Sequence, residues 1–424
     1  MTGQIQVVGL GVNAKADLSA EALQALHQSD LVIGSERQLD TLEQIIPVGK
    51  ESIVLPKLSA LKALIDEQLV KGRTVLVLAS GDPLFYGIGR WFSRYFSAEL
   101  LTFYPAVSSL QVACHRLGIA LQDVEVLSLH GRPLSKLRTR LRQDQPLLLL
   151  TDKHSTPEAL ANECIACGFS EAKITVCEML GYPQEMIRSF TAQTLSNTGR
   201  STKFASLHVT LLEPGCNQGF LPAFPGIPDQ HFVTDKEDAG RGMITKREVR
   251  LSILSLLQVA KGECVWDIGA GCGGVAVELA YWNPNSDIYA VEHHSDRFDC
   301  LEQNRQRFGV VSNLSIIEGR APQALADLPA PDKVFIGGSG GELAALLDQI
   351  WTLLPPGGIL LGSAVTEQSK CDYYQFNQTR TQRADSENET LQLSVSRGDR
   401  LAGQIMYRPS LPVTLYLFKK EPLS

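Results

Sequence analysis

The chain has 424 residues, a formal net charge of −7, 44% hydrophobic residues and 20% charged residues. This length exceeds what one ordinary hydrophobic core accommodates, so two domains of a globular protein are expected. The acidic balance argues against broad capture of nucleic acid, and the sequence shows neither an apolar run of the ~20 residues that span a bilayer nor a signal peptide, so a cytoplasmic protein without a membrane partner is expected.

The first half of the chain alternates short apolar strands with helices. Strands are expected where β-branched or leucine-rich runs are bounded by turn residues, at 5–10, 74–78, 126–129, 147–150 and 174–177. A helix is expected at 19–27, and the alternating residues 204–212 indicate an edge or antiparallel strand. This succession predicts an α/β domain with a mostly parallel sheet.

One cysteine pair has the spacing of a metal or redox motif. Cys164 and Cys167 lie in a segment, 157–168, that predicts a helix. A zinc site needs a second pair of ligands at suitable spacing, and none is obvious. We therefore expect reduced core thiols and no metal.

Prolines and glycines punctuate residues 213–228, which excludes a helix or a central strand there. The sequence thus predicts a first domain at 1–215, a linker at 216–228 and a second domain at 229–424. In the second domain a helix is expected at 245–259 with Thr245 as N-cap, and the polar residues 385–389 are expected to form a loop. Strands are expected at 264–267, 287–291, 314–317, 334–336, 359–362 and 413–418, which predicts a Rossmann-like sheet.

A glycine-rich loop follows the first strand of the second domain and reads Asp267-Ile268-Gly269-Ala270-Gly271-Cys272-Gly273. Glycine allows a backbone geometry that a Cβ forbids and lets a ligand approach closely. Glu292 ends the next strand, where an acid accepts hydrogen bonds from ribose hydroxyls. A ligand-free turn and a dinucleotide site are the alternatives, but the spacing favours S-adenosylmethionine.

This loop, together with the segments 243–250 and 335–343, resembles the Rossmann-like methyltransferases. Within them it is similar to the C15-methylating, decarboxylating corrinoid enzymes of cobalamin biosynthesis, over roughly residues 226–420. The resemblance implies that the methyl acceptor meets Gly338 and Ser339, and a substrate with many carboxylates suggests a contact with Arg397. It implies cofactor contacts at Thr245, Gly269, Ala270, Gly271, Cys272, Gly273, Glu292 and Ala321. Ser363 departs from the family, in which many relatives have Asn.

A second glycine-containing loop, Gly81-Asp82-Pro83, follows the expected strand 74–78 in the first half. Alone, it is also compatible with a purely structural connection. Together with the segments 7–11 and 105–109 it resembles the tetrapyrrole methyltransferase family, which binds S-adenosylmethionine in a cleft between two α/β lobes. The resemblance implies cofactor contacts at Gly81, Asp82 and Ser108.

Two further segments, 128–132 and 177–185, resemble the C5-methylating member of the corrinoid series. They suggest that His130 and Arg132 contact the substrate, although a structural histidine is the alternative for His130. The first glycine loop reads Gly9-Leu10-Gly11-Val12-Asn13 and departs from the commoner Gly-x-Gly-Pro-Gly.

The two resemblances together cover nearly the whole chain. They imply an α/β fold with an N-terminal two-lobed tetrapyrrole methyltransferase domain and a C-terminal Rossmann-like class I methyltransferase domain, each with one S-adenosylmethionine. The implied function is methylation of a precorrin at carbons 5 and 15, with decarboxylation of a ring acetate, by a dimer or tetramer. Transfer from a sulfonium needs alignment and not a dedicated nucleophile, so no catalytic residue is assigned. A tRNA or protein methyltransferase with an N-terminal recognition module, and a non-catalytic N-terminal scaffold, are the alternatives.

Overall fold

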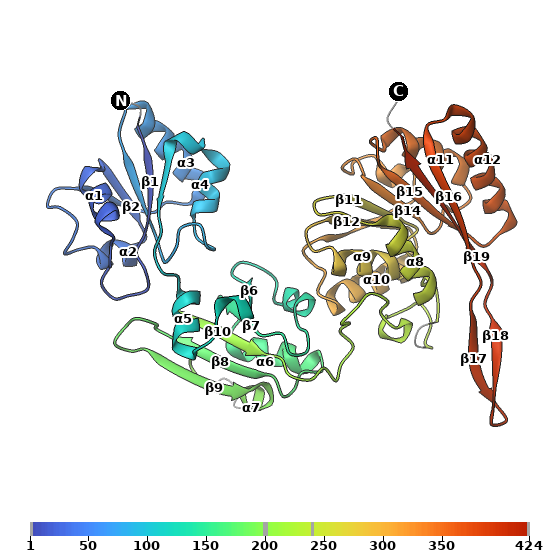
Figure 1. Ribbon diagram of the computed structural model, residues 1–424, viewed down its shortest axis with the longest axis horizontal. Coiled ribbons are helices and arrows are strands. Elements are labelled where there is room, and N and C mark those ends of the chain that lie inside the picture. Colours follow the sequence, from blue (N-terminus) through green and yellow to red (C-terminus); the bar gives the residue numbers. More distant parts are fainter. Residues whose placement is uncertain (1–2, 198–201, 239–240, 422–424) are drawn as a thin grey trace. The chain divides into compact units, whose positions relative to one another are not determined.

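The computed structural model describes residues 3–197, 202–238 and 241–421 (Figure 1). The chain divides into two compact units. The first contains Met1–Arg132 and Gln143–Asn217, and the second contains Pro133–Arg142 and Gln218–Ser424. No helix in the described ranges is long and apolar enough to cross a membrane.

The first lobe of the first unit is a five-stranded parallel sheet in the order β3-β2-β4-β1-β5. Helices cover both faces, so neighbouring residues of one strand enter different cores: Val7 packs with Leu61 and Phe92, whereas Val8 packs with Ala22. This two-sided burial explains the continuous apolar runs. The elements are β1 (Ile5–Gly9), α1 (Ala20–Gln28), β2 (Leu31–Gly34), α2 (Glu36–Thr41), β3 (Glu51–Val54), α3 (Leu58–Val70), β4 (Val75–Ala79), α4 (Gly89–Tyr95), η1 (Ala98–Leu100) and β5 (Leu101–Tyr104).

The second lobe has a mixed sheet in the order β6-β7-β10-β8-β9, in which only β6 and β7 are parallel. The expectation of a mostly parallel sheet is therefore wrong for this lobe. A connection of seven residues, 179–185, joins β8 to β9, and a link that short imposes an antiparallel pair. The elements are α5 (Ser109–Leu117), η2 (Leu121–Asp123), β6 (Glu125–Ser128), β7 (Leu147–Leu150), α6 (Pro157–Ala166), β8 (Lys173–Glu178), β9 (Met186–Thr191), α7 (Ala192–Asn197) and β10 (His208–Glu213).

Both cysteines of the Cys-x-x-Cys pair lie at the end of α6. Cys164 and Cys167 are fully buried and neither forms a disulfide. Burial raises the pKa of the Cys164 thiol. Together these properties describe core thiols, because a reactive cysteine requires an accessible thiolate.

The second unit is a seven-stranded sheet in the order β13-β12-β11-β14-β15-β19-β16 (Figure 1). Its first five strands are parallel, and β19 and β16 complete it as antiparallel strands. The elements are η3 (Leu134–Thr139), η5 (Asp229–His231), α8 (Arg247–Leu257), β11 (Cys264–Ile268), α9 (Gly274–Trp282), β12 (Asp287–Glu292), α10 (Ser295–Arg307), β13 (Leu314–Glu318), η6 (Gln323–Leu325), β14 (Lys333–Ile336), α11 (Leu343–Leu353), β15 (Ile359–Ala364), α12 (Glu367–Arg383), β16 (Ser386–Leu393), β17 (Ser396–Leu401), β18 (Gln404–Pro409) and β19 (Val413–Lys420).

Two expectations for the second unit are wrong. The expected loop at 385–389 is wrong from Ser386 onward, because these residues belong to β16, which pairs along its whole length with β19 at the sheet edge. Thr245 is not an N-cap, because α8 begins at Arg247 with Lys246 as its cap residue.

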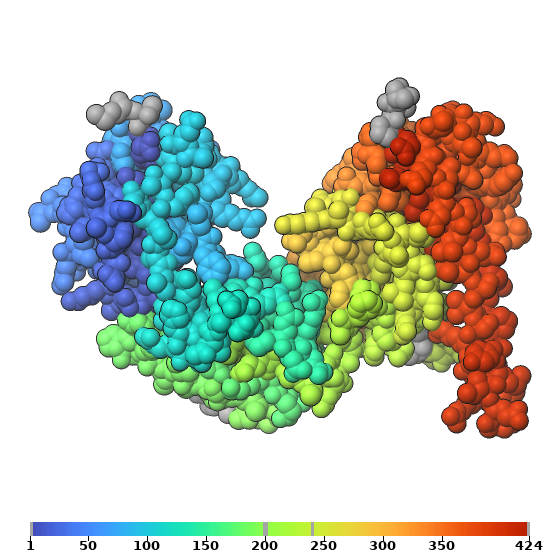
Figure 2. Space-filling view, viewed as in Figure 1, coloured from blue at the N-terminus to red at the C-terminus, as the bar shows by residue number. Residues whose placement is uncertain are grey.

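A hairpin of β17 and β18 stands clear of the sheet beyond β16 and β19 (Figure 1 and Figure 2). Every residue of both strands is exposed. Four apolar side chains, Leu401, Ile405, Met406 and Tyr407, are between 51% and 74% exposed. The hairpin was not predicted from the sequence, because its strands lack a buried apolar face.

Candidate functional site

The second unit has a pocket of about 460 Å³ at the carboxyl ends of its parallel strands. Its walls come from the turns after β11, β12, β13 and β14, from β15 and from the segment before α8. Ligands of open α/β sheets bind at these strand ends. The lining includes Thr245, Gly269, Ala270, Gly271, Glu292, Ala321, Gly338 and Ser339.

The glycine loop after β11 has room for no side chain at two positions. Gly269 has φ +72°, and a Cβ there would come within 2.5 Å of the Gly338 carbonyl oxygen. Gly271 has φ +60°, and a Cβ there would come within 2.4 Å of the Met243 carbonyl oxygen. The turn after β11 therefore packs its backbone directly against the backbone at Gly338 and at Met243. No side chain of these two glycines occupies the adjoining pocket.

Glu292 is held in place by the loop that it faces. Its side chain is buried, Oε2 accepts the Gly271 backbone N–H at 2.8 Å, and Oε1 accepts the backbone N–H groups of His293 and His294 at 2.9 and 3.0 Å. An ionised carboxylate offers about four acceptor positions. Because Oε1 already accepts two N–H groups, the remaining capacity for a ligand hydroxyl is on Oε2, which accepts only Gly271.

Asp267 lies behind this loop in β11 and is 1% exposed, with no hydrogen-bond partner for its Oδ2 among the described residues. Burial raises the pKa of Asp267 to about 7, and the charge of Glu292 acts in the same direction. The two acids behind the glycine loop thus differ in environment, because Glu292 is stabilised by three N–H donors.

Three of the residues expected at this site do not line the pocket. Cys272 is fully buried and burial raises its pKa to about 12. Gly273, with φ +86°, packs against Leu301. Arg397 lies on the β17–β18 hairpin and donates to Glu248 at 2.7 Å, so its charge is compensated by an ion pair outside the pocket.

Several polar residues of this pocket were not predicted from the sequence. His293 and His294 follow Glu292 directly, and their rings lie 3.9 Å apart. Arg297 and Arg320 bring positive charge to the lining. Their positions at the first turns after β12 and β13 are the signal that could have identified them.

A buried arginine supports the pocket from behind. Arg250 of α8 is 0% exposed and donates to Glu278 at 2.6 Å and to Asp229 at 3.0 Å. It also donates to the carbonyl of Thr245, which lines the pocket. Arg250 therefore fixes the segment before α8 against α9.

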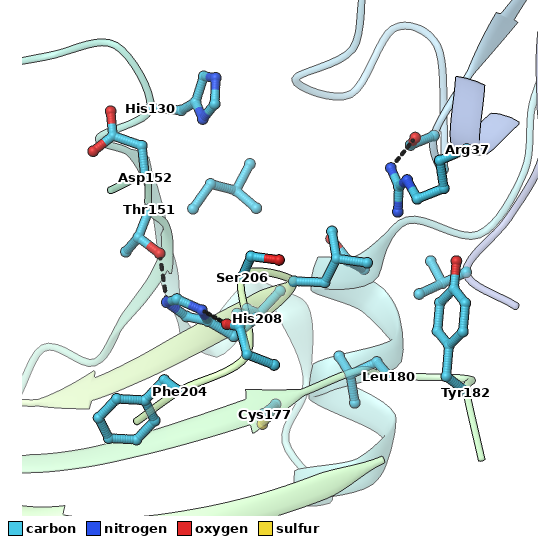
Figure 3. Close-up of a pocket in the computed structure, with 18 of the residues that line it drawn as sticks. Arg37, His130, Thr151, Asp152, Cys177, Leu180, Tyr182, Phe204, Ser206 and His208 are labelled. Carbon is cyan, nitrogen blue, oxygen red and sulfur yellow. Dashed lines mark hydrogen bonds between the residues drawn. The ribbon is translucent and has the colours of Figure 1, made fainter. Parts of the chain in front are cut away.

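The first unit has a larger pocket, of about 1270 Å³, between its two lobes (Figure 3). The first lobe contributes the turns after β1 and β4 and residues of α2, and the second lobe contributes the ends of β7, β8 and β10. Figure 3 shows Arg37 across the pocket from His130, Thr151 and Asp152.

Two polar groups of the second lobe have well-defined partners. His208 lies 2.8 Å from the Thr151 hydroxyl through Nε2 and 2.7 Å from the Ala205 carbonyl through Nδ1, so Nδ1 carries a proton. Asp152 accepts the backbone N–H groups of Gly131 and His154, which lower its pKa. The carboxylate of Asp152 thus links the turn after β6 to its own turn after β7.

Two of the five residues expected at this pocket, Gly81 and His130, line it. Asp82 accepts the backbone N–H groups of Leu84 and Phe85 at 2.7 and 3.0 Å and so stabilises its own turn. Ser108 is the N-cap of α5 within a capping box. Arg132 donates to the Ser128 carbonyl and is not among the lining residues.

Four further polar residues line this pocket that the sequence had not assigned to it: Arg37, Ser80, Tyr182 and His208.

Comparisons with known families match the two units separately. Residues 4–196 match the family described as tetrapyrrole (corrin/porphyrin) methylases, and residues 237–420 match a precorrin methyltransferase domain. The expected fold class, a tetrapyrrole methyltransferase unit followed by a Rossmann-like methyltransferase unit, is confirmed.

Curated relatives match nearly the full length. The precorrin-6Y C(5,15)-methyltransferase [decarboxylating] of Sinorhizobium sp is 32% identical over 98% of this chain and 96% of its own length. The protein of the same name from Mycobacterium tuberculosis (strain CDC 1551 / Oshkosh) is 31% identical over 98% of this chain and 100% of its own. A probable cobalt-precorrin-6B C(15)-methyltransferase (decarboxylating) of Pyrobaculum aerophilum is 32% identical over 45% of this chain and 94% of its own. The tRNA and protein methyltransferase alternative gains no support from these relatives.

Proposed function

Because the chain belongs to the precorrin-6Y C5,15-methyltransferase (decarboxylating) family, we propose that its two units divide the work on one precorrin. The first unit methylates carbon 5, and the second methylates carbon 15 and decarboxylates the ring acetate. Each unit uses its own S-adenosylmethionine. The observation that carries this division is that two different methyltransferase families match two units, each of which has a pocket beside a glycine turn. We propose domains at 1–215 and 229–424, joined by 216–228.

The second unit's pocket fits S-adenosylmethionine. Its volume of about 460 Å³ lies in the range of ~300–1,000 Å³ that is usual for small-ligand sites. Gly269 and Gly271 line it where a Cβ would collide with backbone, so the chain itself leaves space for a close ligand. Glu292 would hold the ribose hydroxyls with its fixed carboxylate.

The first unit's pocket fits the same cofactor by a different architecture. A Cβ added at Gly9 would lie 2.3 Å from the Gly81 carbonyl oxygen, and one added at Gly181 would lie 1.6 Å from the Val12 carbonyl oxygen. These close approaches join the turn after β1 to the turns after β4 and β8. The resulting cradle is built from backbone, with Asp82 and Ser108 holding its turns in shape.

S-adenosylmethionine supplies an activated methyl group on a positively charged sulfur. The residues of each pocket align the acceptor carbon and exclude water, which provides most of what a displacement requires. In the second unit, the small residues Gly337, Gly338, Ser339 and Gly340 leave room for a large flat acceptor beside the cofactor loop. Three cationic side chains at the rim, Lys246, Arg297 and Arg320, would bind its carboxylates. Arg297 and Arg320 would do so in exchange for their acidic partners Asp235 and Glu342, at 3.4 and 3.7 Å.

Mass spectrometry of the product tests the division of work. With precorrin and S-adenosylmethionine, the wild-type protein should add two methyl groups and release one carbon dioxide. Gly271→Arg should yield a product that carries one methyl group, at carbon 5, and retains the acetate. Gly9→Val should lose methylation at carbon 5. Double methylation by either variant would overturn the assignment of that unit.

We further propose that the protein self-associates, as a dimer or tetramer, through the β17–β18 hairpin. An isolated two-stranded hairpin is marginally stable in water. Ile405 and Tyr407 lie two residues apart on one face of this hairpin, and exposed apolar side chains that lie together mark interaction surfaces. Light scattering after gel filtration should give a multiple of the chain mass for the wild type. The double variant Ile405→Asp/Tyr407→Asp should shift it toward the monomer, and a monomeric wild type would contradict the proposal.

A further inference from the structure

One arginine of the first unit's pocket is held in place without being neutralised. Arg37 lies in the first turn of α2, and its guanidinium donates to the Ser80 hydroxyl at 3.0 Å (Figure 3). The side-chain amide of Gln38 donates to the same oxygen at 3.1 Å. Ser80 lies between β4 and Gly81, so the three residues fix a positive charge beside the glycine turn.

Other arginines of this unit have acidic partners. Arg188 lies 2.7 Å from the buried Glu178, and Arg116 lies 2.5 Å from Glu185. No ion pair of Arg37 occurs within the described ranges of the chain, where its contact is a neutral hydroxyl. A guanidinium has five N–H donors, so most of its hydrogen-bonding capacity remains for a ligand.

The charge of the surrounding wall supports an anionic ligand. Lys153 and Lys203 also line the pocket, in a chain whose formal net charge is −7. Of the two acids in the lining, Asp152 is occupied by the backbone N–H groups of Gly131 and His154, and Glu158 is the other. The lining thus carries three positive and two negative side chains, an excess of one positive charge in a chain that is negative as a whole.

We propose that Arg37 binds a peripheral carboxylate of the precorrin during methylation at carbon 5, with Ser80 and Gln38 as positioning residues. The inference rests on the proposed function of the first unit. A guanidinium pairs with a carboxylate through two parallel hydrogen bonds, which fixes orientation as well as affinity. The pair would set the angle of the macrocycle beside the turn at Gly81.

Steady-state kinetics of carbon-5 methylation test the assignment. Arg37→Gln should raise the KM for precorrin by about tenfold or more, and Arg37→Lys should give an intermediate value because ammonium cannot form the paired contact. Ser80→Ala should raise the KM less than Arg37→Gln does. It keeps the charge of Arg37 and removes only the hydroxyl that holds the guanidinium in place. The matched control is Arg90→Gln, an exposed arginine of α4 outside the pocket lining, with kinetics like those of the wild type.

Two readouts separate recognition from a folding defect. The Kd of the first unit for S-adenosylmethionine should stay within about twofold of wild type in Arg37→Gln, and the KM of the wild type should rise more steeply with salt than that of the variant. If Arg37→Gln leaves the KM unchanged while the wild type methylates carbon 5, the inference is wrong. If the wild type does not methylate carbon 5, the proposed function of the first unit fails instead.

Discussion

Replacing Gly271 by alanine should disable the second cofactor pocket and leave the first intact. The residue has φ +60°, a left-handed conformation that costs an L-residue about 1–2 kcal/mol. The new Cβ would also lie 2.4 Å from the Met243 carbonyl oxygen, which accepts the Cys272 N–H at 2.9 Å. Weakening that hydrogen bond costs roughly 1 kcal/mol more.

The sum, about 2–3 kcal/mol, is relieved if the loop leaves the conformation that binds the cofactor. This corresponds to S-adenosylmethionine binding that is weaker by roughly 30- to 150-fold. Calorimetric titration of the full chain should then resolve one tight site where the wild type has two, and the product should lack the methyl group at carbon 15.

Gly262→Ala is the matched control. Gly262 has φ +88°, and a Cβ added there would meet no atom within 4 Å, so alanine has the backbone strain without the collision. The residue also lies outside the pocket lining. The reasoning is refuted if Gly271→Ala binds two cofactors with wild-type affinity, or if Gly262→Ala loses the second site equally.

Three further predictions concern buried charges of the second unit. Arg250→Met leaves Glu278 without its cation and Asp229 with only Arg397, at 3.6 Å, and should destabilise this unit by about 3–5 kcal/mol in urea denaturation; a loss below about 1 kcal/mol would contradict the clamp. Burial raises the pKa of Asp267 to about 7 from its usual 3.8, so the folded state holds a proton that the unfolded state has lost between these values. The free energy of unfolding of the wild type should therefore fall as pH rises through this window, and that of Asp267→Asn should rise relative to it from about pH 5 to 7. A difference between the two proteins that stays constant over this range would exclude this role. Glu292→Gln places an N–H₂ group among backbone N–H donors, so the Kd for S-adenosylmethionine should rise at least several-fold in calorimetry, and an unchanged Kd would contradict the ribose contact.

The sequence predicted best what depends on local chemistry. Buried parallel strands such as β11 and β12 are continuous apolar runs, and glycine turns follow them directly, so both were found. β16 was missed because an edge strand is defined by its backbone pairing with β19, which its polar side chains do not reveal.

The roles of single polar residues depended on tertiary contacts. For Asp82 and Ser108, which were expected to contact the cofactor, the structure adds a role that the sequence did not indicate: their side chains accept backbone N–H groups of their own turns. Arg37 gained its position through Ser80, which is 43 residues away in sequence. No spacing rule connects residues that far apart, so a pattern could not identify this contact.

The cluster around Arg250 affects how the second unit can be separated from the chain. Glu278, the buried partner of Arg250, also accepts the backbone N–H groups of Gly226 and Ile227 at 2.7 and 2.9 Å. A fragment that starts at residue 229 would lose both donors and leave a buried carboxylate with fewer hydrogen bonds. A fragment that starts at Gln218 keeps them but lacks Pro133–Arg142, which also belongs to the second unit. A separated second unit should therefore retain the residues just before 229, and it still loses the contacts of Arg138 with Arg307 and Tyr281.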